Sequence, residues 1–303
     1  MTGERAVAIV GATASGKSAL AHDIARSSGG SIEIVCVDAM TVYRGMDLAT
    51  AKPTLDERRE VRYHLVDLVD ASQEFSVEQF QRLAREAARE VWSRGHAVLY
   101  VGGTGLYGRA VIDQLEIPGR YPVVRAQLEA RAATELGVLY DELSRLDPVA
   151  AARMEPSNQR RVVRALEVTL GAGRPFSSFG SGLRTYATTS VAQVGLRVDT
   201  STLDARVEAR FREWLERGLL DEVRALAALP EGMSRTARQA VGYRQLLAHI
   251  EDSAALEACV DEALTQSRRL ARRQRSWFER DPRVEWFDDP AQARDRVRAL
   301  LEC

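Results

Sequence analysis

One segment near the start of the sequence constrains the fold more than any other. It has the spacing G-x-x-x-x-G-K-[ST], and its residues are Gly11, Ala12, Thr13, Ala14, Ser15, Gly16, Lys17 and Ser18. An apolar, β-branched run precedes it at 6–10, and apolar residues with helical spacing follow it at 18–26. A strand, a glycine loop and a helix in this order surround a phosphate with backbone N–H groups and the positive end of the helix dipole. The segment therefore predicts a phosphate loop (P-loop), with Lys17 for a distal phosphate and the Ser18 hydroxyl for Mg²⁺.

The alternation of strand and helix continues along the chain. Further buried strands are predicted at 31–37, 97–101 and 191–198, and Ser76-x-x-Gln79 predicts a capped helix through residue 92. This order indicates an α/β fold, with a P-loop NTPase-like parallel sheet and flanking helices. We expect a core formed by 1–118 and 188–303, interrupted by a helical insertion at 119–187. Helical blocks are expected at 202–229 and 254–280, and a loop rich in Gly, Ser and Thr at 171–189.

The composition narrows the class of protein. A formal net charge of -1 over 303 residues argues against a uniformly basic nucleic-acid coat, but it leaves room for local basic patches. The three cysteines, Cys36, Cys259 and Cys303, have no C-x-x-C spacing, which argues against a disulfide framework or a zinc site. No apolar stretch is long enough to span a membrane. We therefore expect a cytoplasmic protein without a membrane partner.

Two polar residues follow predicted strands. Asp38 follows the strand at 31–37, and Thr104 lies in the glycine-rich turn after the strand at 97–101. The carboxyl ends of parallel strands form the crevice in which open α/β sheets bind ligands. Asp38 could ligate Mg²⁺ there, act as a general base or cap a turn, and the residues alone leave these interpretations open.

Cationic residues mark further candidate positions. Only Lys17 and Lys52 are lysines, so the run 47–53 around Lys52 is a candidate substrate loop. Arg206 and Arg210 lie one helical turn apart. We expect one of them to reach the phosphate site, while the other could form a surface ion pair.

Arginines also cluster at 160–164, 235–244 and 268–280. Such clusters suit contact with a nucleic-acid backbone, and Trp277 within the third is a candidate for RNA contact. The alternative is a solvated helix face that nearby acids balance. The four histidines lack metal-ligand spacing, and we expect them to be structural.

Further motifs occur in a fixed order along the chain: Val37-Asp38, Tyr43-Arg44-Gly45-Met46-Asp47, Thr50-Ala51-Lys52-Pro53, Val101-Gly102-Gly103-Thr104-Gly105-Leu106-Tyr107, Asp147-Pro148-Val149-Ala150-Ala151-Ala152-Arg153, Arg164-Ala165-Leu166-Glu167-Val168, Val241-Gly242-Tyr243-Arg244-Gln245 and Arg273-Gln274-x-x-Trp277. Together with the P-loop, this order resembles that of the bacterial tRNA dimethylallyltransferases, of the tRNA isopentenyltransferase family. The resemblance covers nearly the whole chain, and the combination is far more specific than the P-loop alone.

The resemblance implies transfer of a dimethylallyl group from dimethylallyl diphosphate to N6 of the adenosine at tRNA position 37, next to the anticodon, with release of diphosphate. It implies that the P-loop grips the diphosphate, with Mg²⁺ on Ser18. Asp38 would accept a proton from the amine, Thr104 would position the reacting groups and Arg210 would neutralise the departing diphosphate. The implied contacts with the anticodon arm are Asp38, Ala39, Met40, Thr41, Thr104, Arg125, Gln159, Arg160, Arg161, Val162 and Val163. We expect a monomer with tRNA and dimethylallyl diphosphate as its partners.

Two positions depart from the family pattern. Thr41 stands where the family often has Gln or Leu, and Ala49 where Gly is usual. The first puts local base contacts in doubt, and the second puts the flexibility of the loop before Lys52 in doubt. The competing hypotheses are a small-molecule kinase that uses the same loop for ATP, and a non-catalytic RNA-binding protein that ATP regulates.

Overall fold

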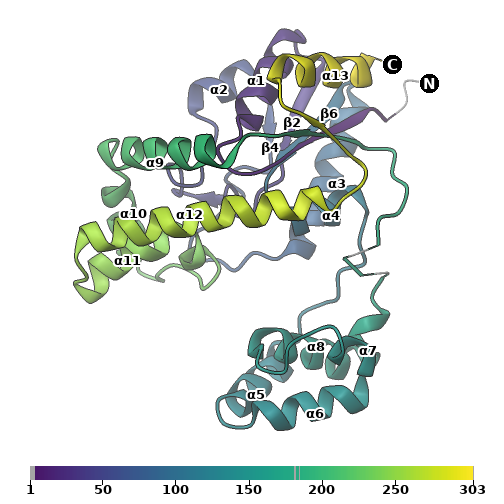
Figure 1. Ribbon diagram of the computed structural model, residues 1–303, viewed down its shortest axis with the longest axis vertical. Coiled ribbons are helices and arrows are strands. Elements are labelled where there is room, and N and C mark those ends of the chain that lie inside the picture. Colours follow the sequence, from purple (N-terminus) through teal and green to yellow (C-terminus); the bar gives the residue numbers. More distant parts are fainter. Residues whose placement is uncertain (1–3, 181, 184, 303) are drawn as a thin grey trace. The chain divides into compact units, whose positions relative to one another are not determined.

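The protein is described from a computed structural model that covers residues 4–180, 182–183 and 185–302. Its contacts separate two compact units, which are Met1–Ile112 with Thr188–Cys303, and Asp113–Ala187. The first unit carries the sheets and the second is built of helices (Figure 1). In the described part of the chain, no helix combines the length and apolar character that crossing a bilayer requires.

Six parallel strands form the main sheet of the first unit, in the order β4-β2-β6-β1-β7-β8. Their bounds are β1 Ala6–Val10, β2 Ile32–Cys36, β4 Tyr63–His64, β6 Ala97–Gly102, β7 Ala192–Leu196 and β8 Val284–Phe287. A second, two-stranded sheet pairs β3 (Tyr43–Arg44) with β5 (Val69–Asp70). Because β2, β6 and β1 are neighbours and parallel, their carboxyl ends meet at one edge of the sheet, and the segments that follow them meet there too.

Helices cover both faces of the main sheet because alternate residues of each strand point to opposite sides. Val7 and Ile9 of β1 pack with α1 and α13, whereas Ala8 and Val10 pack with α3, α11 and α12. The helices of this unit are α1 Lys17–Ser27, α2 Leu55–Glu60, α3 Val77–Ser93, α4 Gly105–Ile112, α9 Thr200–Glu216, α10 Leu219–Ala227, α11 Tyr243–Asp252, α12 Leu256–Glu279 and α13 Pro290–Glu302, with a 3₁₀ turn η2 at Ala237–Gln239. A capping box at Ser76 and Gln79 begins α3.

The predicted parallel α/β class is confirmed, and the differences lie at its margins. The short strands β4 and β8 are absent from the prediction because two or four residues in polar surroundings carry little periodic signal. The block predicted at 202–229 is divided by Gly218, whose φ of 95° ends α9 and begins α10. Helix α11 lies outside both predicted blocks.

The second unit packs its helices around their own core. They are α5 Pro122–Ala132, α6 Leu136–Leu146, α7 Pro148–Ala151 and α8 Gln159–Ala172, followed by the 3₁₀ turn η1 Phe176–Ser178. Leu139, Leu143 and Leu166 are fully buried there. The loop predicted from 171 begins later, because α8 continues to Ala172 and ends at Gly173 with φ 67°. Ser181 and Arg184 of that predicted loop lie outside the described residues.

Candidate active site

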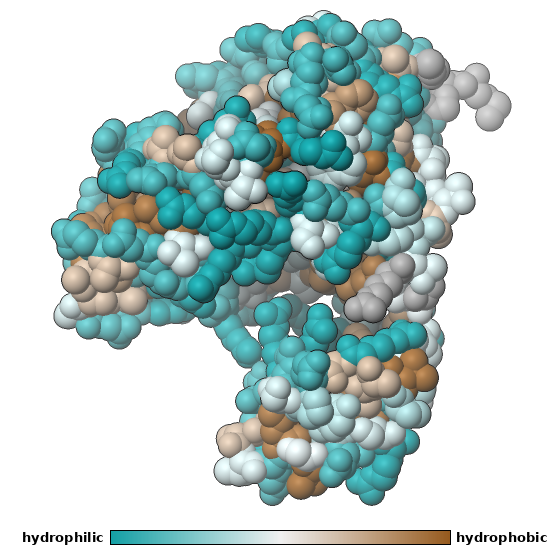
Figure 2. All heavy atoms as spheres, in the orientation of Figure 1, coloured by the Kyte–Doolittle hydropathy of each residue, from teal (hydrophilic) through white to brown (hydrophobic). Residues whose placement is uncertain are grey.

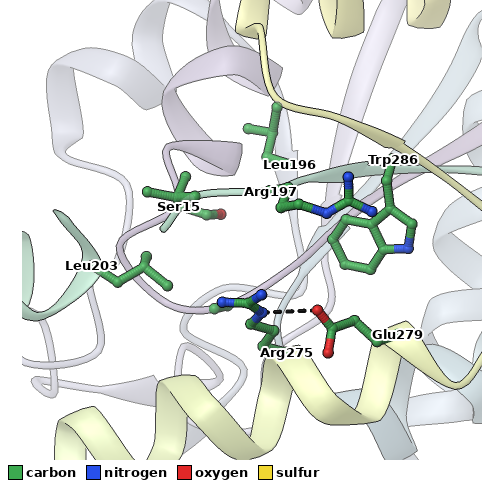
Figure 3. Close-up of a pocket in the computed structure, with 9 residues that line it drawn as sticks. Ser15, Leu196, Arg197, Leu203, Arg275, Glu279 and Trp286 are labelled. Atoms are coloured by element: carbon green, nitrogen blue, oxygen red, sulfur yellow. Dashed lines mark hydrogen bonds and ion pairs between the residues drawn. The ribbon is translucent and has the colours of Figure 1, made fainter. Parts of the chain in front are cut away.

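The P-loop joins β1 to α1 and encloses its own lysine. Gly16 caps α1 with a φ of 93°, a left-handed conformation that glycine adopts without strain. The Lys17 ammonium donates to the carbonyl oxygen of Ala12 at 3.0 Å. Ser15 is buried and lines a small pocket with Leu203 and Trp286, among others (Figure 3). Ser18, in contrast, is exposed at the start of α1, so its hydroxyl is open to a ligand.

Asp38 and Thr104 meet at the edge of the sheet where β2 and β6 end. The Thr104 hydroxyl donates to Asp38 Oδ2 at 3.3 Å, and the backbone N–H of Met40 donates to Asp38 Oδ1 at 2.8 Å. The carboxylate therefore caps its own turn and also contacts the hydroxyl of the neighbouring strand's loop. The sequence left several roles open for Asp38. Two of them, a turn cap and a reacting group, are compatible in this one side chain.

Arg206 and Arg210 of α9 both reach the P-loop. Arg210 donates to the Thr13 hydroxyl at 2.6 Å, while Arg206 lies 3.5 Å from the carbonyl oxygen of Ala14. Arg210 is the more enclosed, and its guanidinium stacks 4.7 Å from the centre of the Trp214 ring. Its Nε is buried without a hydrogen-bond partner among the described residues. Arg210 is thus held rigidly beside the loop, whereas Arg206 is exposed.

Charges at this edge influence one another. Burial first and the nearby charge of Arg210 second lower the pKa of Lys17 to about 8, while Asp38 opposes the shift. Burial also lowers the pKa of Arg210 to about 10. Lys17 and Arg210 are two cations held close together and partly shielded from water, so they repel each other. An anionic ligand bound beside them relieves this repulsion. The site is therefore suited to a diphosphate or polyphosphate.

Helix α12 supplies two residues that the sequence interpretation did not place in the site. Gln274 Oε1 accepts the backbone N–H of Thr13 at 2.7 Å. The ring of Trp277 lies against Gly105, where an added Cβ would come within 2.2 Å of the indole. Trp277 is therefore packed beside the Thr104 loop, and the RNA contact expected for it stays a prediction. The motif Arg273-Gln274-x-x-Trp277 was the available signal, because residues three apart share a helix face.

Lys52 differs from its expected role. Its ammonium is buried and contacts Asp47 at 2.5 Å, Asp67 at 2.6 Å and the carbonyl oxygen of Tyr43 at 2.7 Å. Glu222 holds the same loop through the backbone N–H of Asp47 at 3.1 Å. The predicted substrate loop is thus a structural network, because every donor of the ammonium is engaged within the protein.

The departure at Ala49 has a simple structural outcome. Ala49 does not adopt a positive φ, so its backbone does not require glycine. Its methyl group instead faces Gly242, where an added Cβ would lie 3.2 Å away. The two small residues therefore allow the loop and α11 to approach closely.

Five of the predicted tRNA contacts lie at the start of α8, and their side chains differ in solvent exposure. Gln159, Arg160 and Arg161 are exposed at the start of α8. Val162 and Val163 are at most 1% exposed, because the helical repeat turns them into the core of this unit. Their side chains pack in this core, and the tRNA contact predicted at these two positions stays a prediction.

Two other predicted contacts are already engaged or enclosed. Arg125 donates to Glu129 at 2.9 Å and to the buried Glu167 at 3.1 Å. Thr41 is only 5% exposed, and its hydroxyl has no partner among the described residues. The Thr41 side chain is therefore enclosed, and the tRNA contact predicted at this position stays a prediction. Ala39 and Met40 are partly exposed.

The arginine cluster on α12 separates into two faces. Arg268 pairs with Glu208 and Arg272 with Asp204, both of α9, and Arg275 pairs with Glu279 (Figure 3). Arg269 and Arg273, which follow Arg268 and Arg272 in the sequence, point to an adjacent face of the helix, are exposed, and form no ion pair with a described residue. The surface that carries α9 and α12 is largely hydrophilic (Figure 2). The solvated-face alternative thus holds for the first set, and Arg269 and Arg273 stay available for an anionic partner.

The donors beside the P-loop are hard oxygens, namely the hydroxyls of Ser18 and Thr104 and the carboxylate of Asp38. No group of three His, Cys, Asp or Glu side chains in the described part of the chain could hold a metal ion. Mg²⁺ needs no such cage, because it binds through one or two protein oxygens together with substrate phosphates and water. The donor set therefore fits Mg²⁺ that arrives with a phosphorylated substrate.

A P-loop on a parallel sheet, with a carboxylate and a buried arginine at the same edge, defines the class of P-loop enzymes that act on diphosphate or polyphosphate substrates. Comparison with known proteins narrows this class. The family model of the IPP transferases matches residues 41–281. The tRNA dimethylallyltransferase of Bifidobacterium animalis subsp. lactis is 43% identical over 99% of this chain and 87% of its own length. That of Kineococcus radiotolerans is 45% identical over 98% and 95%.

Solved structures of the same kind of enzyme also match this chain. The full-length tRNA isopentenylpyrophosphate transferase of Bacillus halodurans superposes with a TM-score of 0.71 at 35% identity, covering 99% of this chain and 97% of that one. A eukaryotic dimethylallyltransferase acting on tRNA gives 0.77 at 25% identity, covering 97% and 77%. The chain belongs to the IPP transferase family, as its motifs predict.

Proposed function

We propose that this enzyme transfers a dimethylallyl group from dimethylallyl diphosphate to N6 of the adenosine at tRNA position 37, next to the anticodon, and releases diphosphate. The observation that carries the proposal is the meeting of the Asp38–Thr104 pair with Lys17 and Arg210 at one edge of the sheet. An acceptor for a proton and cations for a leaving diphosphate are the two requirements of this reaction. The relatives' names, tRNA dimethylallyltransferase, support the same assignment.

The chemistry assigns a role to each group. The N6 nitrogen attacks the first carbon of the dimethylallyl group, and the carbon–oxygen bond to the diphosphate breaks with its electron pair on the leaving oxygen. Asp38 takes the proton that N6 loses, while Thr104 orients the carboxylate through its hydrogen bond. Lys17, Arg210 and the P-loop N–H groups stabilise the charge that develops on the diphosphate. The adenosine has to leave its stack to reach these groups.

Mg²⁺ on the Ser18 hydroxyl would neutralise part of the diphosphate charge. Gln159, Arg160 and Arg161 of the second unit, and the unpaired Arg269 and Arg273 of α12, suit contact with the phosphates of the anticodon arm. We propose a monomer, because the four groups of the site come from one unit of one chain. A cytoplasmic location follows from tRNA as substrate.

The test is incubation of the purified enzyme with Mg²⁺, unmodified tRNA and radiolabelled dimethylallyl diphosphate, followed by nucleoside analysis. We expect the label on the adenosine beside the anticodon, and none in a matched tRNA with guanosine at position 37. Parallel reactions contain γ-labelled ATP in place of the prenyl donor. Phosphate transfer to a small molecule, without label from the prenyl donor, would contradict the proposal and support the kinase hypothesis.

A further inference from the structure

Gln274 of α12 contacts both loops of the site with the two ends of one carboxamide. Its oxygen accepts the N–H of Thr13 in the P-loop at 2.7 Å. Its nitrogen lies against Gly103, so close that an added Cβ on Gly103 would come within 2.7 Å of Nε2. Gly103 directly precedes Thr104, the partner of Asp38. One side chain thus spans the gap between the diphosphate loop and the loop of the reacting pair.

Thr13 is held on two sides as a result. Gln274 accepts from its backbone N–H, and Arg210 donates to its hydroxyl at 2.6 Å. The main chain of a P-loop must present its remaining N–H groups to a phosphate in one fixed curvature. A glycine-rich loop has little stiffness of its own. The conformation of this loop at Thr13 therefore depends on side chains supplied by α9 and α12.

We infer that Gln274 is a positioning residue that sets the spacing between the P-loop and the Thr104 loop, and hence between the bound diphosphate and Asp38. An amide suits this place because its oxygen accepts a hydrogen bond while its other end carries no negative charge. A glutamate would keep the acceptor but bring an anion beside the diphosphate. A methionine would keep the size and lose the acceptor, leaving the Thr13 N–H unsatisfied.

This inference rests on the proposed function, but its first test needs no turnover. Binding of inorganic diphosphate with Mg²⁺ is measured by calorimetry for the wild type, Gln274→Met and Gln274→Glu. The control is Gln266→Met, because Gln266 lies on the same helix and the hydrogen bond of its amide to a described residue goes to Glu262 of that helix. We expect roughly tenfold weaker binding for Gln274→Met. The loss for Gln274→Glu should be larger and should grow as salt is lowered.

The second test is a double-mutant cycle with Gly103→Ala. An added Cβ on Gly103 would lie 2.7 Å from Gln274 Nε2 and 3.1 Å from the carbonyl oxygen of Gly11, so Gly103→Ala displaces the amide. We expect Gly103→Ala and Gln274→Met each to lower kcat with little change in the KM for tRNA. Combined with Gln274→Ala, which vacates the space, the effects should be less than additive. Non-additivity shows that the two residues act through one contact. The selective effect on kcat is the result not expected of a residue that merely stabilises the fold.

Two results would overturn the inference. One is diphosphate binding by both Gln274 variants within twofold of the Gln266→Met control. The other is a loss of diphosphate binding that comes together with weaker tRNA binding and a lower melting temperature. That combination would mark Gln274 as a general packing residue. If the wild type binds diphosphate but transfers no prenyl group, the proposed function fails while the binding test of Gln274 still stands.

Discussion

Strand β2 carries a carboxylate near each end, and the two have opposite surroundings. Glu33, near the amino end, is 3% exposed and accepts from Arg94 at 2.8 and 2.9 Å and from the rings of His64 and His96 at 2.7 Å each. Asp38, just past the carboxyl end, has two weaker attachments, to Met40 N–H and the Thr104 hydroxyl. Strand β2 therefore connects Glu33, whose carboxylate accepts four hydrogen bonds, to Asp38, whose carboxylate can accept further ones.

The difference separates structural from reactive polar groups. Burial by itself would raise the pKa of Glu33, but its hydrogen bonds to Arg94, His64 and His96 hold it at about 2. Such a group cannot accept a proton near neutral pH. The two lysines repeat the contrast, because Lys52 is enclosed by carboxylates while Lys17 faces the P-loop. Glu33 and Lys52 are thus engaged in structural networks, whereas Asp38 and Lys17 lie in the proposed site, and for the two carboxylates this contrast follows the two ends of β2.

Among the substitutions that test this contrast between reactive and structural groups, we expect the largest effect on activity at Arg210. Arg210→Met removes the buried cation beside Thr13 and should lower kcat/KM about 100- to 1,000-fold. Arg206→Met should cost less than about tenfold, because that side chain is exposed and lies farther from the loop. Arg212→Met is the control, since it removes an exposed arginine of the same helix paired with Glu208. Equal losses for Arg206 and Arg210 would contradict the assignment.

At the opposite edge we expect a loss of stability with little loss of activity. Glu33→Gln leaves Arg94 without its buried partner and should lower the free energy of unfolding by about 3 kcal/mol. Chemical denaturation measures this, with Glu86→Gln as the control because the pair that Glu86 forms with Arg82 is exposed. An unchanged unfolding midpoint would show that the Glu33 cluster is not structural.

The same carboxylate predicts a direction with pH. The folded-state pKa of Glu33 is below its unfolded value, so its stabilising effect is complete above pH 4.5 and is lost as pH falls towards about 2. Glu33→Gln should therefore destabilise the protein at pH 7 and much less at pH 3. A constant difference between the two proteins over this range would contradict the assignment.

The smallest expected effect concerns Lys17. Its pKa of about 8 means that it loses its charge as pH rises through 8, well below the ordinary range of lysine. The KM for dimethylallyl diphosphate should rise about tenfold by one pH unit above that value. In Lys17→Arg, which keeps its charge, KM should stay flat over the same range. Parallel profiles for the two proteins would contradict the assigned role.

The sequence predicts the residues proposed to react better than it predicts the residues that hold them in place. The P-loop, Asp38 and Thr104 belong to local motifs, and neighbouring parallel strands place them at one edge. For Arg210 the residues alone left the choice between Arg206 and Arg210 open, and the resemblance to the family named it. The engaged state of Lys52 and the burial of Val162 and Val163 depend on residues distant in sequence or on the phase of a helix. Gln274 is separated from Thr13 by most of the chain, so only the packed α12 reveals their contact.

The most direct test of the central claim is the single-turnover rate of Asp38→Asn with tRNA and dimethylallyl diphosphate both bound. The asparagine keeps the size of the side chain and can still accept hydrogen bonds, but it cannot take the N6 proton. We predict wild-type affinity for both substrates, an unchanged melting temperature and transfer slowed about 1,000-fold. Transfer within tenfold of the wild-type rate would show that Asp38 is not the base.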